Sequence, residues 1–337
     1  MKTINIKLLT LVATFLVILL HTAAIPFSYF HLAWSVSVMY EALGRIAFPL
    51  FLLIAGYVSL NKNESLLSTL KTRVLDLVIP LIAWTVVYIV YSQQVKMSEA
   101  PVSVLDLLSM PAWPHLWFAY TMILLYLVTP LLNTFITYGS RQRVNYTLAV
   151  WFVLASVYML FDNVKANLLE GRPLPAPSNI DMVVYLSGFY IIGGVVRRFK
   201  ITPKVAIAAV VFTLSVVLTA VMTYSLSIST FRPNAIFLFY SAPTLVVVSL
   251  AFFFMLLNAP LKFNKPAIGV IRALSNLSLG IFFVHALVLE VMLNLLGINF
   301  EGYYSILTIP LVALVCFAIS AVIVWLIRLI PFVRRIT

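Results

Sequence analysis

Long apolar runs, separated by shorter polar segments, recur along the whole chain. Each run approaches the roughly 20 residues that an α-helix needs to cross the hydrocarbon core of a bilayer. A helix that is apolar on every face is typical of a membrane span rather than of a water-exposed surface. The pattern predicts ten such helices, at approximately 8–25, 43–60, 73–91, 116–137, 146–161, 181–196, 204–224, 234–257, 278–296 and 304–330.

The composition agrees with a membrane protein. Of the 337 residues, 63% are hydrophobic and only 9% are charged, whereas soluble domains carry roughly 25% charged residues. The apolar runs are too long for the strands of a membrane β-barrel, which need only about ten residues each. We therefore predict an all-α, polytopic integral membrane protein, and we interpret residues 1–337 as a single domain.

Lysine and arginine are distributed unequally between the two sets of connections. If the chain has ten spans, five of its 22 basic residues fall on one side and the remaining 17 fall on the side that holds both termini. The positive-inside rule assigns the richer side to the cytoplasm, so both termini are predicted to be cytoplasmic. The smaller set is Arg45, Lys96, Lys165, Arg172 and Arg232. The net charge of +12 then reflects topology, and we expect membrane lipids rather than nucleic acid as partners.

Three ionisable residues lie in or next to the first two predicted spans. His21 comes late in the first span and Arg45 comes early in the second, which runs in the opposite direction, so both are expected in the outer third of the membrane. Glu41 precedes Arg45 by one helical turn and shares its face if the second helix extends that far. Ionisable groups at this depth are costly and usually functional. They form a candidate acid–base site, in which the imidazole is the general base and the guanidinium stabilises an anion.

These residues also have structural interpretations. His21 can be a packed histidine that hydrogen-bonds a nearby carbonyl, and Arg45 can extend its guanidinium to the membrane interface. The first run, with its basic start and the small residues after His21, also resembles a secretory signal. It is long for such a signal, and many more spans follow.

A further histidine, His285, lies in the ninth predicted helix. If that helix begins at residue 278, His285 lies about 10 Å from the cytoplasmic face, which is about 10 Å below His21. We therefore do not expect the two imidazoles to be direct partners. His285 either lines a path from the cytoplasm or is structural.

The sequence carries no recognised pattern for a bound cofactor or metal. It has no GxGxxG or Walker sequence and no Cys and His residues at zinc-binding spacing, and its single cysteine, Cys316, lies inside an apolar run. We expect no permanently bound cofactor and no metal site.

Four short runs, at fixed order and spacing, resemble a known family. They are His21-Thr22 late in the first helix, RIAFPLFLLIAGY from Arg45 to Tyr57, HLWF at 115–118 and SLGIFFVH at 278–285. Over about residues 5–330 the chain resembles the membrane-bound acyltransferase-3 family, the bacterial glycan O-acyltransferases. It is most similar to the compact, single-domain type.

The resemblance implies a ten-helix enzyme of the bacterial cytoplasmic (inner) membrane. It would transfer an acyl group, usually acetyl, from acyl-CoA to a hydroxyl of a cell-surface polysaccharide or its lipid-linked precursor. Acetyl-CoA would be the donor substrate and not a resident cofactor. His21 would deprotonate the acceptor hydroxyl or carry the acyl group transiently, Arg45 would stabilise developing negative charge, and Glu41 would orient one of them.

The resemblance also implies positions for the two substrates. His115 and Trp117 would shape the mouth of the acceptor site, and His285 would lie nearer the donor. One position departs from the family pattern, because the family commonly has an arginine eleven residues before the helix-1 histidine and this chain has Thr10. Lys7, one turn away, can replace it at the CoA phosphates; otherwise the chain uses another donor or has lost activity.

Two other functions fit the same residues. A transporter of a glycan or a lipid-linked sugar would use the polar groups to line a conduit, and a structural membrane subunit would not use them at all. The surface glycan distinguishes the enzyme from the transporter, because an enzyme changes its acyl content and a transporter changes its presence outside the cell.

Overall fold

The computed structural model describes residues 2–30, 34–62, 66–95, 107, 111–171, 178–298, 300 and 304–337. Every regular element in these ranges is a helix, and ten helical segments are long and apolar enough to cross a membrane. This confirms the predicted all-α class and the ten spans. The main elements are α1 (Lys2–Phe27), α2 (Trp34–Gly44), α3 (Ala47–Ser59), α4 (Leu66–Thr69), η1 (Leu70–Val74), α5 (Leu75–Val95), η2 (Pro114–Leu116), α7 (Trp117–Tyr138), α8 (Arg141–Trp151), η3 (Phe152–Tyr158), α9 (Met159–Val164), η4 (Lys165–Leu169), α10 (Asn179–Arg198), α11 (Val205–Ser229), η5 (Ile236–Leu238), α12 (Pro243–Asn258), α13 (Lys265–Leu296), α14 (Ser305–Arg328) and η6 (Arg334–Ile336).

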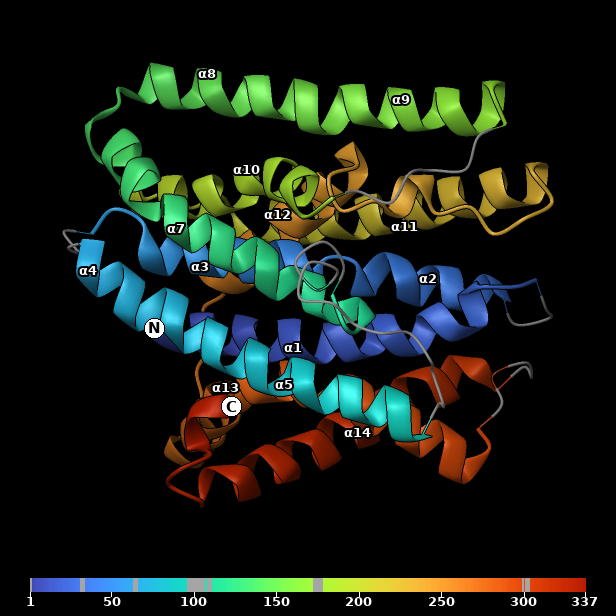
Figure 1. Cartoon of the computed structure of the whole chain (residues 1–337). Coiled ribbons are helices and arrows are strands. Elements are labelled where there is room, and N and C mark those ends of the chain that lie inside the picture. The colour runs from blue at the N-terminus through green and yellow to red at the C-terminus, as the bar shows by residue number, and fades with distance from the viewer. Residues whose placement is uncertain are drawn as a thin grey trace.

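The first helix lies in the middle of the bundle (Figure 1). It packs against α2, α3, α12, α13 and α14. The span formed by α8, η3, α9 and η4 runs along one edge of the bundle (Figure 1) and exposes large apolar side chains such as Leu154 and Phe161, as expected for a helix that faces lipid. The central position of α1 gives His21 neighbours from several other helices.

The second span consists of two helices, because the backbone leaves the helical path at Arg45 and Ile46, between α2 and α3. Its second half is held firmly against α10. A Cβ atom added to Gly56 would lie 1.8 Å from the carbonyl oxygen of Tyr190, so only glycine fits there. Small residues allow membrane helices to approach in this way. The contact anchors the far end of α3, the helix that follows the break at Arg45.

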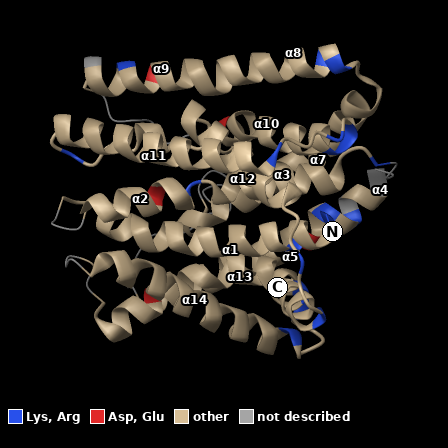
Figure 2. Cartoon of the chain, turned by 180° about the vertical axis from the view of Figure 1, so that it is seen from behind, with Lys and Arg blue, Asp and Glu red and all other residues tan. Residues whose placement is uncertain are grey.

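Both termini lie at one end of the bundle, and most lysines and arginines gather at that same end (Figure 2). We call it the basic end. The assignment of this end to the cytoplasm stays a prediction from the positive-inside rule. Of the smaller basic set, Lys96 and Arg172 lie outside the described residues.

The ninth span is longer than the apolar pattern indicates. The helix α13 begins at Lys265, not at residue 278. Its first half carries Lys265, Arg272 and Asn276, which lower the hydropathy and hide the helix from a search for apolar runs. The start of this helix is marked in the sequence by Asn264, a residue type that favours the N-cap position. In the structure its side chain accepts a hydrogen bond from the backbone N–H of Ala267 at 3.0 Å.

The second span also begins earlier than the apolar pattern indicates. The residues from 34 to 42, interpreted from the sequence as part of an outer connection, belong to α2. Trp34 is buried, and its indole N–H donates a hydrogen bond to the carbonyl of Phe27 at 3.0 Å. As a result Glu41 lies inside a helix, one turn before Arg45.

Candidate active site

Three histidines from distant parts of the chain meet inside the bundle. His21 comes from α1, His115 from the short helix η2 that precedes α7, and His285 from α13. The ring centroids are 5.3 Å apart for His21 and His285, 4.9 Å for His115 and His285, and 6.1 Å for His21 and His115. His115 and His285 are fully buried. We call these three residues the histidine cluster.

The position of His285 corrects the prediction that it lies about 10 Å below His21 and does not contact it. Because α13 begins at Lys265, His285 lies about 30 Å along its helix. His21 lies at nearly the same distance from the start of α1, which packs against α13 and begins at the same end of the bundle. The two imidazoles therefore reach the same depth, and His285 is not nearer to the basic end than His21.

A tyrosine of α5 holds α13 beside the cluster. The Tyr88 hydroxyl donates a hydrogen bond to the carbonyl of Phe283 at 2.8 Å and accepts one from the backbone N–H of Leu287 at 3.3 Å. Its ring centroid lies 5.3 Å from that of His115. Tyr88 thus links His115 to the turn of α13 that carries His285. No spacing signal in the sequence identified it.

Arg45 and Glu41 form an ion pair within the second span. The Arg45 Nε lies 2.8 Å from Glu41 Oε2. Glu41 is fully buried and the Arg45 side chain is 23% exposed, so the carboxylate has the cation that a buried charge needs. The guanidinium carbon of Arg45 also lies 5.3 Å from the ring centroid of Tyr240. Glu41 therefore contacts Arg45, and among the described residues no hydrogen bond or ion pair joins it to His21.

The backbones of α1 and α2 bring the ion pair next to the cluster. A Cβ atom added to Gly44 would lie 2.8 Å from Cα of Leu20, so the two helices are in backbone contact at this point. Gly44 precedes Arg45 and Leu20 precedes His21. The contact therefore places the backbones of Arg45 and His21 close to each other.

Trp117 and His115 lie in different surroundings, although only Leu116 separates them in the sequence. The Trp117 ring packs against Phe48 at 4.9 Å and against Tyr240 at 5.3 Å between centroids. It therefore belongs to the aromatic side chains around Arg45. It does not line the cavity that His21 and His115 share. His115 is fully buried within the histidine cluster and also lines that cavity, and its place at the acceptor site stays a prediction.

A cavity of about 370 Å³ opens beside the cluster on the side away from the basic end. We call it the outer cavity. Its lining includes His21, Trp113 and His115, together with Glu290 and Asn294 of α13. An aromatic ring together with polar groups of this kind suits a ligand that carries hydroxyl groups.

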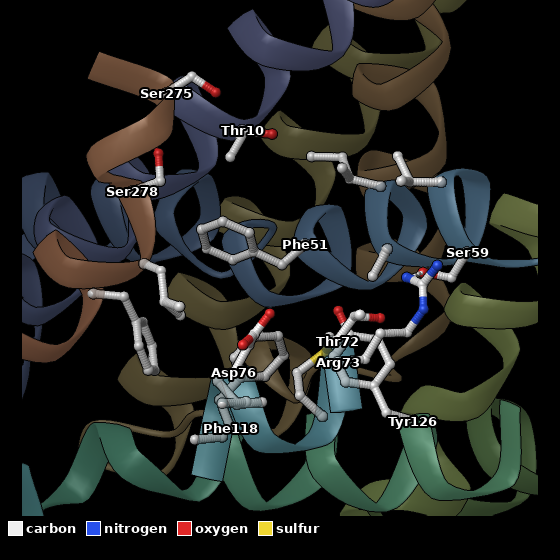
Figure 3. Close-up of a pocket in the computed structure, with 18 of the residues that line it drawn as sticks. Thr10, Phe51, Ser59, Thr72, Arg73, Asp76, Phe118, Tyr126, Ser275 and Ser278 are labelled. Atoms are coloured by element: carbon white, nitrogen blue, oxygen red, sulfur yellow. Dashed lines mark hydrogen bonds between the residues drawn. The ribbon is translucent and has the colours of Figure 1, made fainter. Parts of the chain in front are cut away.

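A second cavity, of about 410 Å³, lies towards the basic end (Figure 3). We call it the inner cavity. Thr10 and Phe51 approach it from α1 and α3, and Arg73, Asp76 and Tyr126 approach it from the opposite wall (Figure 3). Along α1, the Thr10 of this cavity and the Ile25 of the outer cavity are separated by about 22 Å.

One basic residue, Arg73, lines the inner cavity, and a second, Lys7, contacts the lining residue Asn276. Arg73 donates a hydrogen bond to the hydroxyl of Ser59, and its guanidinium carbon lies 6.0 Å from the ring centroid of Tyr126. Lys7 Nζ donates a hydrogen bond at 2.9 Å to Oδ1 of Asn276, which also lines this cavity.

Two phenylalanines separate the inner cavity from the histidine cluster. Phe282 and Phe118 both line the inner cavity, and their ring centroids are 6.0 Å apart. The Phe282 ring lies 5.3 Å from that of His115 and 6.1 Å from that of His285. The two cavities therefore approach one histidine cluster from opposite ends of the bundle.

The site brings together the groups that acyl transfer to a hydroxyl requires. An imidazole can accept the hydroxyl proton, and a fixed guanidinium can stabilise the negative charge that develops on oxygen. Among the residues that the structure describes, no group of three or more His, Cys, Asp or Glu side chains is arranged to hold a metal ion.

Comparison with known families places this site in a wider context. Residues 4–328 match the family model described as an acyltransferase domain, that of the acyltransferase-3 family. No curated protein and no solved structure matches the chain. The family match covers nearly all of the chain, including every residue of the histidine cluster and the Arg45–Glu41 pair. The chain therefore belongs to the acyltransferase-3 family and is a membrane acyltransferase.

Proposed function

We propose that this acyltransferase is an O-acetyltransferase of the bacterial cytoplasmic membrane. It transfers the acetyl group of acetyl-CoA to a hydroxyl of a cell-surface polysaccharide or its lipid-linked precursor. The observation that carries the proposal is the pair of cavities, which approach the histidine cluster from opposite ends of the bundle. Such an arrangement allows a donor from one side of the membrane and an acceptor from the other to meet at the same imidazole.

The inner cavity suits the donor. It opens near the basic end, where Lys7 and Arg73 offer positive charge to the phosphates of CoA. Beyond them the cavity is lined mainly by apolar and aromatic side chains as far as Phe282, which suits the thinner pantetheine arm. In this proposal the two basic side chains take the place of the arginine that Thr10 replaces.

The outer cavity suits the acceptor. Trp113 offers a ring on which a sugar can stack, and Glu290 and Asn294 offer hydrogen-bonding groups for its hydroxyls. His21 lines this cavity, whereas Arg45 and its partner Glu41 are not among the lining residues.

The chemistry follows from these positions. His21 accepts the hydroxyl proton as the acceptor oxygen attacks the thioester carbonyl, and Arg45 stabilises the oxyanion. The carbon–sulfur bond then breaks, and the CoA thiolate takes the proton from His21. A route through an acetyl group carried on His21 uses the same residue and forms the same products.

The experiment is a transfer assay in membrane vesicles, combined with mass spectrometry of the surface glycan. The wild-type protein should transfer label from acetyl-CoA to the glycan, and His21→Ala should abolish the transfer. Ser28→Ala, at the exposed residue directly after the same helix, is the control and should leave transfer unchanged. A folded His21→Ala protein with full transfer would refute the proposal. If removal of the protein eliminated the entire glycan from the surface, export would be indicated instead.

A further inference from the structure

We infer that His285 is a positioning residue that sets which nitrogen of His21 carries hydrogen, and so leaves a lone pair of His21 free for the acceptor. The inference rests on the proposed function of His21 as a base or acyl carrier. It concerns how that imidazole is prepared for the reaction.

The structure assigns the tautomer of His285 itself. Its Nδ1 lies 2.7 Å from the carbonyl oxygen of Phe282 and 3.2 Å from that of Ile281. A carbonyl oxygen only accepts hydrogen bonds, so Nδ1 must carry the hydrogen. In a neutral ring the lone pair is then on Nε2.

That lone pair is inside the histidine cluster. Nε2 of His285 is buried and has no hydrogen-bond partner, and the same holds for Nε2 of His21 and for both ring nitrogens of His115. We assign the His285 lone pair to His21, because the His115 ring stands more nearly perpendicular to the His285 ring, at 68°. The rings of His21 and His285 are neighbours, with centroids 5.3 Å apart and planes inclined at 38°. Two adjacent buried nitrogens without partners are satisfied together if one donates and the other accepts, and buried polar groups are nearly always satisfied in some way.

In this pairing His285 sets the direction. Because its Nε2 can only accept, Nε2 of His21 is the donor. The hydrogen of His21 is then on Nε2, and its lone pair is on Nδ1. Since the His21 ring lines the outer cavity, Nδ1 is the nitrogen left for the acceptor hydroxyl.

The proton balance of the reaction is unchanged by this arrangement. The acceptor hydroxyl gives its proton to His21 Nδ1, and His285 Nε2 stabilises the resulting imidazolium through the Nε2 hydrogen. After the carbon–sulfur bond breaks, the proton on Nδ1 passes to the CoA thiolate. His285 touches neither substrate and acts through His21 alone.

Two substitutions of His285 separate positioning from packing. His285→Asn keeps an N–H that can donate to the Phe282 carbonyl but removes the acceptor at Nε2. His285→Gln can place an amide oxygen near the position of Nε2. We expect His285→Asn to lower kcat about 100-fold, within the range of a lost acid–base contribution, with KM for acetyl-CoA unchanged. His285→Gln should recover about tenfold of this loss.

If His285 had only a structural role, His285→Asn would have the higher kcat of the two variants, because it preserves the hydrogen bond to the Phe282 carbonyl. A folded His285→Asn protein with wild-type kcat, or a His285→Gln protein no more active than His285→Asn, would overturn the inference. The proposed function would survive that result, provided that wild type transfers acetyl and His21→Ala does not.

A measurement on the wild-type protein avoids any question of variant folding. The chain has only 4 histidines, so nitrogen-15 NMR of histidine-labelled protein can resolve their ring nitrogens, with single substitutions for assignment. We expect Nδ1–H for His285 and Nε2–H for His21. An Nδ1–H tautomer of His21 would contradict the inference whatever the activity of the enzyme.

Discussion

Gly44 lies with its backbone against Leu20, so closely that a Cβ atom on Gly44 would be 2.8 Å from both Cα and Cβ of Leu20. These residues immediately precede Arg45 and His21. The separation between the guanidinium and the imidazole is therefore set by a backbone contact between α1 and α2. A backbone contact is stiffer than one between long side chains, and catalytic groups depend on positions held to a fraction of an ångström.

Gly44→Ala should separate the two helices and lower acetyl transfer. The added methyl group meets backbone atoms that cannot rotate away, and a displacement of about 1 Å near reacting groups can cost about 100-fold in rate. The measurement is kcat in vesicles, together with the melting temperature in detergent. Gly269→Ala is the matched control, because that position in α13 has open space where a Cβ would lie. It should be neutral or slightly stabilising, and an equal loss in both variants would contradict the explanation.

Glu41→Gln should lower kcat at least about tenfold, since it removes the charged partner that holds Arg45 and a charge-assisted hydrogen bond contributes about 1.5–3 kcal/mol. Arg45→Gln should cost more, and the double substitution should cost no more than Arg45→Gln alone. The control is Glu170→Gln, whose carboxylate lies 3.5 Å from exposed Lys165; such surface pairs contribute little. Additive losses for the double substitution would show that Glu41 does not act through Arg45.

Phe282→Ala should widen the acyl groups that the enzyme accepts. The ring stands between the inner cavity and the histidines, where a chain longer than acetyl would have to lie. Removal of the ring should raise the ratio of kcat/KM for butyryl-CoA to that for acetyl-CoA by about tenfold or more, the scale of one or two methylene groups in an apolar pocket. Phe51→Ala, in the same cavity on α3, should change this ratio less. Equal ratios in wild type and Phe282→Ala would place the acyl group elsewhere.

Arg73→Gln should weaken the use of acetyl-CoA without affecting the acceptor. Loss of one phosphate contact should raise KM for acetyl-CoA about tenfold, the effect of about 1.4 kcal/mol. The increase should be smaller at high salt, because ions screen exposed charges. Lys265→Gln removes an exposed charge at the same end of the bundle and serves as the control. A rise in the KM of the acceptor instead would reverse the assignment of the two cavities.

Several features could be predicted from the sequence because they depend on local pattern. Ten spans follow from the length of the apolar runs, and the structure has ten in its described residues. The ion pair between Glu41 and Arg45 follows from a spacing of four residues once both lie near one helical turn. Most basic residues gather at the end that holds both termini (Figure 2). This follows from the sequence because successive connections between spans lie on opposite sides, and those on the side of the termini carry most of the lysines and arginines.

The histidine cluster could not be predicted in this way. The depth of His285 depends on where α13 begins, and the polar residues of its first half concealed that point. A capping asparagine and a proline mark the true start, so a search for helix signals as well as apolar runs would have found it. His115 lies before its span in the sequence, and only the packing of η2 against α13 carries it into the interior.

The order of apolar and charged residues was thus sufficient for the membrane class, the number of spans and one ion pair, since each arises from residues close together in the chain. The meeting of His21 with His115 and His285 required the folded bundle. Contacts between helices depend on where each one starts, how closely small residues such as Gly44 let it approach its neighbour, and which side chains fill the space between them. None of these is a property of any single run of sequence.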